Sequence, residues 1–225
     1  MASKKPIKAV MRERYNVTSS GYDELYRNEQ YEKYRLAMRL LEPRGKVLDD
    51  GCGTALLLEY LYTTGMLGGL LYYICLDLSP GMLRVARRRI ASLNLGHLVE
   101  CIEADAENIP LRSKSIDYTF SFTVVDLVED KARALKEMDR VTKLYTIVTS
   151  LKKAHQFARK IPKYGLYAGE TSKDYVFIRK SSQGLCRLIP HHGSRWSAYR
   201  ALFTAPRQSP SLTSRYFLTA LLTIS

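Results

Sequence analysis

The sequence predicts an α/β fold: a doubly wound, mainly parallel sheet in a three-layer α/β/α sandwich. Apolar runs typical of strands alternate with helical segments between residues 46 and 150, and this alternation is characteristic of parallel βαβ units. A glycine turn, Gly51-Cys52-Gly53, follows the first of these runs and precedes a leucine-rich helical segment. With 225 residues the chain is long enough for one sizeable domain and short for two.

Each element is predicted from its hydrophobic pattern and from the residues that begin or end it. Pro43-Arg44-Gly45 ends a first helix, and Ser79-Pro80 predicts an N-cap followed by proline at the first helical position. Residues 174–180 are predicted to form a last strand at the edge of the sheet. The other expected strands are 46–50, 71–76, 98–103, 116–122 and 144–150, and the expected helices are 23–41, 55–63, 81–92 and 131–141.

The glycine turn is the first candidate binding site. Glycine lets a ligand approach the backbone closely, and the start of the following helix presents free N–H groups. A nicotinamide dinucleotide site is the competing interpretation, but its motif requires glycine or alanine where Leu56 stands. An ordinary strand–turn–helix connection without a ligand also remains open.

Acidic residues stand at the predicted ends of the next strands. Asp77 follows the second strand, where a carboxylate can accept both ribose hydroxyls of a bound nucleoside. Alternatively, Asp77 only favours the N-terminal dipole of the next helix. Asp105 and Ala106 follow the third strand, and Ser121 lies at the end of the fourth. Carboxyl ends of parallel strands share one edge of a sheet, so we expect one site there.

Four runs in this order resemble the class I S-adenosylmethionine-dependent methyltransferases, in particular the methyltransferase type 11 or ubiquinone/menaquinone-biosynthesis-like group with its archaeal relatives. The runs are VLDDGCGTA, LDLSPGMLRVARRR, EADAENIPLRSKSIDYTFSF and ALKEMDRVTK, within a resemblance over about residues 11–180. It implies a Rossmann-like fold, S-adenosyl-L-methionine as cofactor, and a helical lid over residues 11–41. The implied cofactor-binding residues are Tyr22, Asp49, Gly51, Cys52, Gly53, Asp77, Leu78, Asp105, Ala106 and Ser121.

The resemblance also implies a role for each part of the site. The glycine turn faces the methionine end, Asp77 binds the ribose, and Asp105 with Ala106 flanks the adenine; Tyr22-Asp23 matches an element that folds over the cofactor. The chain departs from the family at Ala55, where a third glycine is common, and at Asp50, where a hydrophobe or small residue is commoner. It also lacks the usual Pro-Gly-Gly turn before the fifth strand.

The catalytic residues are left unassigned. Methyl transfer from a sulfonium depends mainly on alignment, and a base is needed only when the nucleophile must lose a proton. Asp126 and Tyr22 are the candidates, with Thr123 and His155 behind them, while Asp126 can equally be a loop or helix-capping acid. The scattered cysteines and histidines predict no metal site.

The acceptor is predicted to be a small molecule. The chain has neither an Asn/Asp-Pro-Pro-Tyr motif nor a Pro-Cys nucleophile at the fourth strand, which disfavours two routes of base or amide methylation. A net charge of +13 keeps tRNA open as an acceptor, and a protein remains possible. A further alternative is a cofactor-binding subunit that needs a partner for activity.

The last part of the chain differs in composition. Residues 1–180 are predicted to be the methyltransferase domain, and residues 181–225 contain five arginines but no lysine and no acid. We expect this tail to be poorly ordered, and interpret it as an extension foreign to the domain or as a basic arm. No apolar stretch predicts membrane insertion, and the cysteine usage suggests a cytoplasmic location. The oligomeric state is not predicted.

Overall fold

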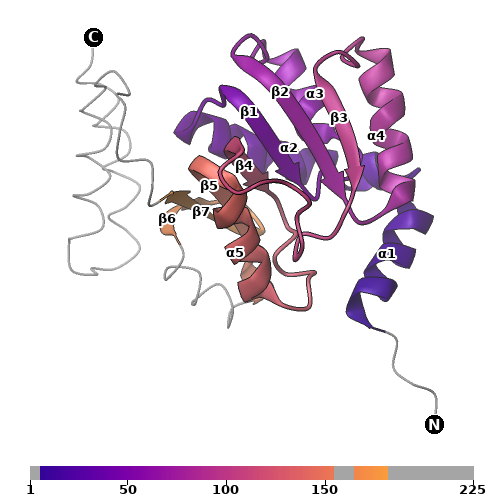
Figure 1. Ribbon diagram of the computed structural model, residues 1–225. Coiled ribbons are helices and arrows are strands. Elements are labelled where there is room, and N and C mark those ends of the chain that lie inside the picture. Colours follow the sequence, from indigo (N-terminus) through magenta and orange to yellow (C-terminus); the bar gives the residue numbers. More distant parts are fainter. Residues whose placement is uncertain (1–5, 155–164, 182–225) are drawn as a thin grey trace. The chain divides into compact units, whose positions relative to one another are not determined.

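The structure is a computed structural model that describes residues 6–154 and 165–181 (Figure 1). The expectations for His155 and for the tail after residue 181 lie outside these residues. No helix within the described ranges has the length and apolar character that a membrane crossing requires.

A seven-stranded sheet forms the centre of the domain, in the order β3-β2-β1-β4-β5-β7-β6. The first five strands are parallel, β7 is antiparallel to β5, and β6 is antiparallel to β7. The direction of winding reverses between β1 and β4, where ligands bind in open α/β sheets. The strands are β1 (Gly45–Asp50), β2 (Leu70–Asp77), β3 (Val99–Glu103), β4 (Ile116–Ser121), β5 (Thr142–Leu151), β6 (Leu166–Glu170) and β7 (Asp174–Lys180).

Helices cover both faces of the sheet, which confirms the predicted doubly wound α/β fold. One apolar cluster joins Val47 and Tyr73 to α2, α3 and α4, and a second joins Leu48 and Ile74 to α5. Val47 and Leu48 are consecutive in β1, and Tyr73 and Ile74 are consecutive in β2. Because side chains alternate along a strand, the two members of each consecutive pair lie on opposite faces of the sheet. Figure 1 shows α5 on the near face, with α2 and α3 behind the sheet. The helices are α1 (Ile7–Thr18), α2 (Tyr22–Leu40), α3 (Leu56–Thr63), α4 (Pro80–Ser92) and α5 (Lys131–Val141), with a short 3₁₀ turn at Lys152–Ala154.

One prediction about the edge of the sheet is wrong, and two elements are not predicted. The strand at residues 174–180 lies between β5 and β6 rather than at the edge, because the short β6 pairs with it outside. The sequence pattern does not predict β6, whose pairing is irregular next to Gly169 at φ +144°. The pattern also does not predict α1 as a separate helix. The helix is short, and none of its residues is fully buried.

The basic run Arg87-Arg88-Arg89 on α4 is predicted to face solvent, and one of its residues does not. Arg89 donates to a backbone oxygen of Thr54 and pairs with Asp23 and Glu59. These ion pairs tie α4 to α2 and α3, which only the folded arrangement brings together. Arg87 and Arg88 are exposed as expected.

Candidate functional site

A cleft opens where β1, β2, β3 and β4 end, beside α1 and the start of α2. It contains about 780 Å³ of empty space, part of which is open to solvent, and this size suits a ligand as large as a nucleoside derivative. Its lining consists of Lys8, Met11, Arg12, Tyr15, Tyr22, Asp50, Gly51, Gly53, Leu76, Asp77, Leu78, Ser79, Met82, Ala104, Asp105, Ala106, Phe122, Thr123, Val124, Leu127 and Val128.

The glycine turn forms one wall of the cleft in a conformation that favours glycine. Gly51 and Gly53 have φ of +77° and +55°. The N–H groups of Gly51 and Cys52 donate to the backbone oxygen of Leu76, at 2.8 and 2.9 Å, and thereby fasten the turn to β2. A Cβ atom on Gly51 would collide with Val124, whereas a Cβ atom on Gly53 would meet no protein atom within 4 Å. The surface at Gly53 is therefore the one that a ligand can approach.

Asp77 links the end of β2 to both the turn and α4. Its carboxylate accepts hydrogen bonds from the N–H groups of Gly53 (2.9 Å) and Ser79 (2.8 Å). The predicted N-cap is present, since Ser79 Oγ accepts from the N–H of Met82 at 3.1 Å. Burial raises the pKa of Asp77, and the N–H groups of Ser79, Gly53 and Leu78 oppose that rise. The bond to Ser79 agrees with the helix-terminus alternative, yet each carboxylate oxygen keeps a second lone pair for a ligand.

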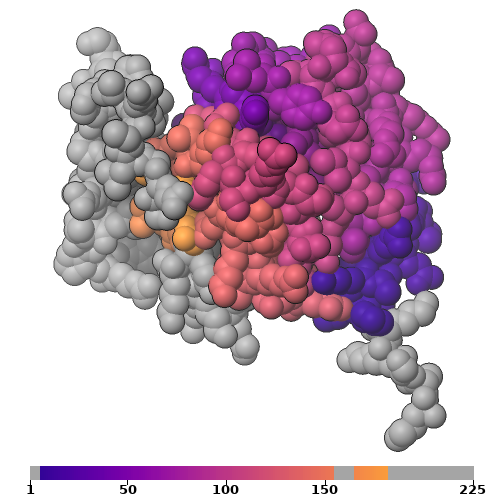
Figure 2. Space-filling view, viewed as in Figure 1, coloured from indigo at the N-terminus to yellow at the C-terminus, as the bar shows by residue number. Residues whose placement is uncertain are grey.

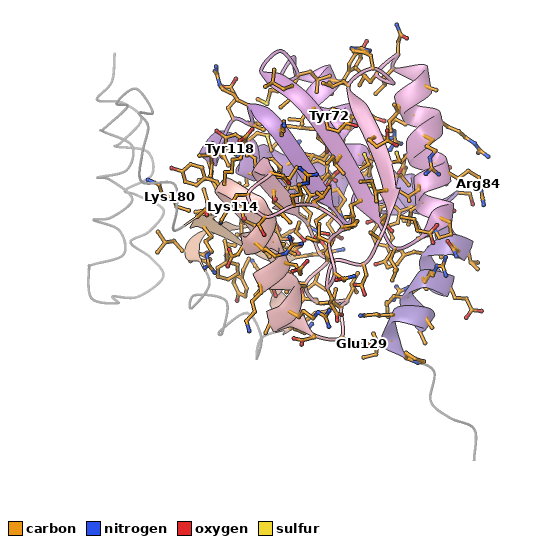
Figure 3. The ribbon with its side chains drawn as sticks, viewed as in Figure 1. Tyr72, Arg84, Lys114, Tyr118, Glu129 and Lys180 are labelled. Carbon is orange, nitrogen blue, oxygen red and sulfur yellow. The ribbon has the colours of Figure 1, made fainter. Side chains whose placement is uncertain are left out.

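The end of β3 is covered by α1. Asp105 accepts from the N–H of Glu107 at 2.9 Å, and its other oxygen pairs with Lys8 Nζ at 2.7 Å. Lys8 Nζ also pairs with Glu107 at 2.9 Å, and the N–H of Lys8 donates to Glu129 at 3.2 Å. Figure 3 labels Glu129 beside the first turn of α1, and in Figure 2 the indigo surface of α1 lies next to the segments that follow β3. The polar contacts of Lys8 therefore hold α1 over this side of the cleft.

α1 also contacts the start of α4. Asn16 Oδ1 accepts from Ser79 Oγ at 2.7 Å and from the N–H of Gly81 at 2.8 Å. A Cβ atom on Gly81 would lie 2.8 Å from Asn16 Cα, so only glycine permits this close packing. α1 thus provides an acceptor for one N–H group at the helix start, that of Gly81, which has no partner within the helix.

Seven of the expected cofactor-binding residues line the cleft, and three do not. The seven are Tyr22, Gly51, Gly53, Asp77, Leu78, Asp105 and Ala106, whereas Asp49, Cys52 and Ser121 are outside its lining. Asp49 lies on the opposite side of β1 from Asp50, where it accepts from the hydroxyl of Tyr73 at 2.8 Å. Burial raises the pKa of Asp49 to about 7, against the effect of the Tyr73 hydroxyl.

The sequence reasoning missed the lining contributed by α1 and by Asp50. Lys8, Met11, Arg12 and Tyr15 come from α1, whose position depends on long-range contacts. The sequence did contain a signal for Asp50: two adjacent acids precede the glycine turn, whereas the resembled family usually has one.

The catalytic candidates have different surroundings. Tyr22 lines the cleft, accepts from Gln30 Nε2 at 3.2 Å, and has its pKa raised by burial, so its phenol remains protonated near neutral pH. Asp126 is absent from the lining; it accepts from Ser150 Oγ (3.1 Å) and from the N–H of Leu151 (2.7 Å). Through these hydrogen bonds Asp126 anchors the end of β5 and has a structural role. Thr123 lines the cleft and accepts from Lys33 Nζ at 2.6 Å.

A metal centre is not found in the part of the chain that the structure describes. Within residues 6–154 and 165–181, no three histidine, cysteine or acidic side chains are grouped so that they could hold an ion.

Comparison with known proteins finds similarity over part of the chain. Residues 48–145 match the family model described as a methyltransferase domain. The chain is 35% identical over 108 residues to a malonyl-acyl-carrier-protein O-methyltransferase from Serratia marcescens, covering 48% of this chain and 38% of the relative. It is 32% identical over 128 residues to the ubiquinone/menaquinone biosynthesis C-methyltransferase UbiE of Campylobacter jejuni, covering 56% and 51%. These alignments span about half or less of each relative.

A solved structure supports the fold. The crystal structure of a SAM dependent methyltransferase from Aquifex aeolicus matches with a TM-score of 0.61 and 19% identity, over 74% of this chain and 98% of that one. The matched segment, residues 48–145, agrees with the resemblance of the sequence motifs to the class I S-adenosylmethionine-dependent methyltransferases. S-adenosyl-L-methionine is the cofactor of this class.

Proposed function

We propose that this chain transfers a methyl group from S-adenosyl-L-methionine to a small-molecule acceptor. The observation that carries the proposal is the placement of Asp77. Its carboxylate is held by the N–H groups of Gly53 and Ser79, and it borders the same cleft as Asp105 and the glycine turn. A nucleoside with a positively charged sulfur fits this set of donors and acids.

Different residues bind different parts of the cofactor. Asp77 accepts hydrogen bonds from the ribose hydroxyls. Asp105 and Ala106 contact the adenine. The turn at Gly51 and Gly53 faces the methionine end. The bound cofactor supplies an electrophilic methyl group. The chain aligns the acceptor with it, and alignment alone provides a large acceleration without a protein base.

The composition of the cleft favours an apolar acceptor. Met11, Phe122, Val124, Leu127 and Val128 line it together. The relatives are named for malonyl-acyl-carrier protein and for ubiquinone and menaquinone biosynthesis, which supports a small or carrier-bound acceptor. A tRNA or protein acceptor and a subunit that requires a partner remain the alternatives.

Calorimetric titration of the full chain tests the proposal. S-adenosylmethionine and its demethylated product are titrated, with NADH as the control ligand. Asp77→Ala should weaken nucleoside binding at least about tenfold, since one hydrogen bond to a charged group contributes about 1.5–3 kcal/mol. Glu100→Ala, which removes an exposed acid outside the cleft, should leave binding unchanged. Binding of NADH, or of neither nucleoside by folded protein, would refute the proposal.

We further propose that residues 1–180 are the catalytic unit and that the protein works in the cytoplasm. The last described strand, β7, ends at Lys180, which supports this boundary.

A further inference from the structure

Asp50 is a buried acid with an unused oxygen at the border of the cleft. It is the last residue of β1, its exposed fraction is 0%, and it belongs to the cleft lining. Its Oδ2 accepts from Ser121 Oγ at 3.3 Å, whereas its Oδ1 has no hydrogen-bond partner among residues 6–154 and 165–181. A buried polar oxygen without a donor is costly, so such a group calls for a ligand or a functional explanation.

Burial, together with neighbouring acids, makes the ionisation of Asp50 costly. Burial raises the pKa of Asp50 to about 7; the Ser121 hydroxyl opposes the rise, and the negative charges of Asp77 and Asp105 add to it. Asp49 lies next to it in β1. Lys8, a base of α1 that lines the cleft, is paired with Asp105 and Glu107. The other ionisable side chains of the lining are Arg12, Tyr15 and Tyr22.

We propose that Asp50 senses the charge of the cofactor and favours the sulfonium of S-adenosylmethionine over the neutral thioether of the product. The inference rests on the proposed function, which places the methionine end of the cofactor at the turn that begins immediately after Asp50. A carboxylate stabilises a nearby positive charge and gains nothing from a neutral sulfur.

The charge changes during the reaction itself. The acceptor's nucleophilic atom forms a bond to the methyl carbon, and the carbon–sulfur bond breaks with its electron pair remaining on sulfur. The sulfur becomes neutral, and any proton that the acceptor loses passes to solvent rather than to Asp50. The attraction between Asp50 and the ligand therefore disappears when the methyl group leaves, which favours product release.

This arrangement couples cofactor binding to pH. A positive sulfur lowers the pKa of a neighbouring carboxyl, so S-adenosylmethionine binding should release a proton from Asp50 near pH 7. Below that range Asp50 is neutral, and the two nucleosides bind with similar affinity. Above it Asp50 is ionised, and the sulfonium form is preferred.

The test is calorimetry of the full chain with both nucleosides at pH 6, 7 and 8, in buffers with different ionisation enthalpies. For the unmodified protein, the preference for S-adenosylmethionine should rise about tenfold between pH 6 and pH 8. A proton should be released on binding the sulfonium but not the thioether. Both ligands carry the same α-amino and carboxyl groups, so the ratio of their affinities isolates the sulfur.

Two substitutions identify the responsible group. Asp50→Asn keeps the size and the bond to Ser121 but cannot ionise, and it should make the preference independent of pH with product affinity changed less than about threefold. Glu100→Gln, outside the cleft, should retain the rise. The inference is overturned if both nucleosides bind the unmodified protein with a constant ratio, or if Asp50→Asn keeps the rise. Binding of neither nucleoside would instead overturn the proposed function together with it.

Discussion

Ala55 shows how one residue can carry a conformation that its family assigns to glycine. It stands directly before α3 with φ +62° and ψ +39°, in the left-handed region. A side chain in that region costs about 1–2 kcal/mol for most residues. This chain therefore places an alanine in a left-handed conformation that glycine adopts at lower cost.

Ala55→Gly should relieve this strain. We expect the free energy of unfolding to rise by up to about 1 kcal/mol, because the gain is partly offset by the greater freedom of glycine in the unfolded chain. Urea denaturation measures the difference. Ala91→Gly, on an exposed right-handed position of α4, should instead lower stability. A loss of stability in both variants would contradict the interpretation.

Gly53→Ala should separate binding from folding. The added Cβ atom meets no protein atom within 4 Å, but it occupies the surface that faces the cleft. We expect S-adenosylmethionine affinity to fall more than about tenfold, with a loss of stability of about 1 kcal/mol from the left-handed backbone.

Gly65→Ala is the matched control, since Gly65 also has a positive φ and open space but lies outside the cleft. It should show the same loss of stability and unchanged affinity. Equal affinities in both variants would mean that the ligand does not approach Gly53.

At the scale of elements, Lys33 connects α2 with the ends of two strands. The side chain is 0% exposed, and Nζ lies 3.1 Å from Glu29, 3.1 Å from Asp174 at the start of β7, and 2.6 Å from Thr123 after β4. Thr123 has φ +67° and borders the cleft. The buried lysine therefore holds a helix, a strand and a wall of the site in one arrangement.

Lys33→Met should destabilise the domain strongly. Methionine fills similar space but leaves Asp174 buried without its positive partner, and breaking a buried ion pair in this way costs about 3–5 kcal/mol. Chemical denaturation at neutral pH is the measurement. Lys143→Met removes a half-exposed ion pair with Asp117 and should change stability by less than about 1 kcal/mol. A small effect at Lys33 would show that Asp174 takes up a proton at little cost.

At the scale of the whole molecule, Ser181 joins the end of β7 to β5 and to the segment before β4. The N–H of Ser181 donates to the backbone oxygen of Leu144 at 2.8 Å, and its hydroxyl accepts from Lys114 Nζ at 2.6 Å. Among residues 6–154 and 165–181, those that line the cleft lie between Lys8 and Val128. Binding and folding should therefore depend on the chain up to residue 181.

A chain that ends after Ser181 should retain both properties. We expect its melting temperature to stay within about 2 °C of that of the full chain, a change that corresponds to less than about 1 kcal/mol. Nucleoside affinity should also be unchanged. Scanning calorimetry and titration of both proteins provide the comparison, and a large fall in melting temperature would assign residues 182–225 to the domain.

The sequence by itself determined the five parallel strands, the helices between them and the strand ends that carry the glycine turn, Asp77 and Asp105. These features follow from local rules: side-chain periodicity, helix caps and turn residues act over a few positions along the chain. The predicted bounds therefore agree closely with those of α4, from Pro80 to Ser92, and of α5, from Lys131 to Val141.

Only the tertiary structure decided which of the expected side chains border the cleft and which further ones join them. Asp49 and Asp50 are adjacent acids in the sequence, and the face that each occupies depends on how β1 sits between β2 and β4. The position of α1 over the site depends on Lys8 and Asn16 meeting residues that follow distant strands. The ion pairs of Arg89 with Asp23 and Glu59 likewise join three helices. Such contacts arise from the packing of segments far apart in the chain, and no local pattern encodes them.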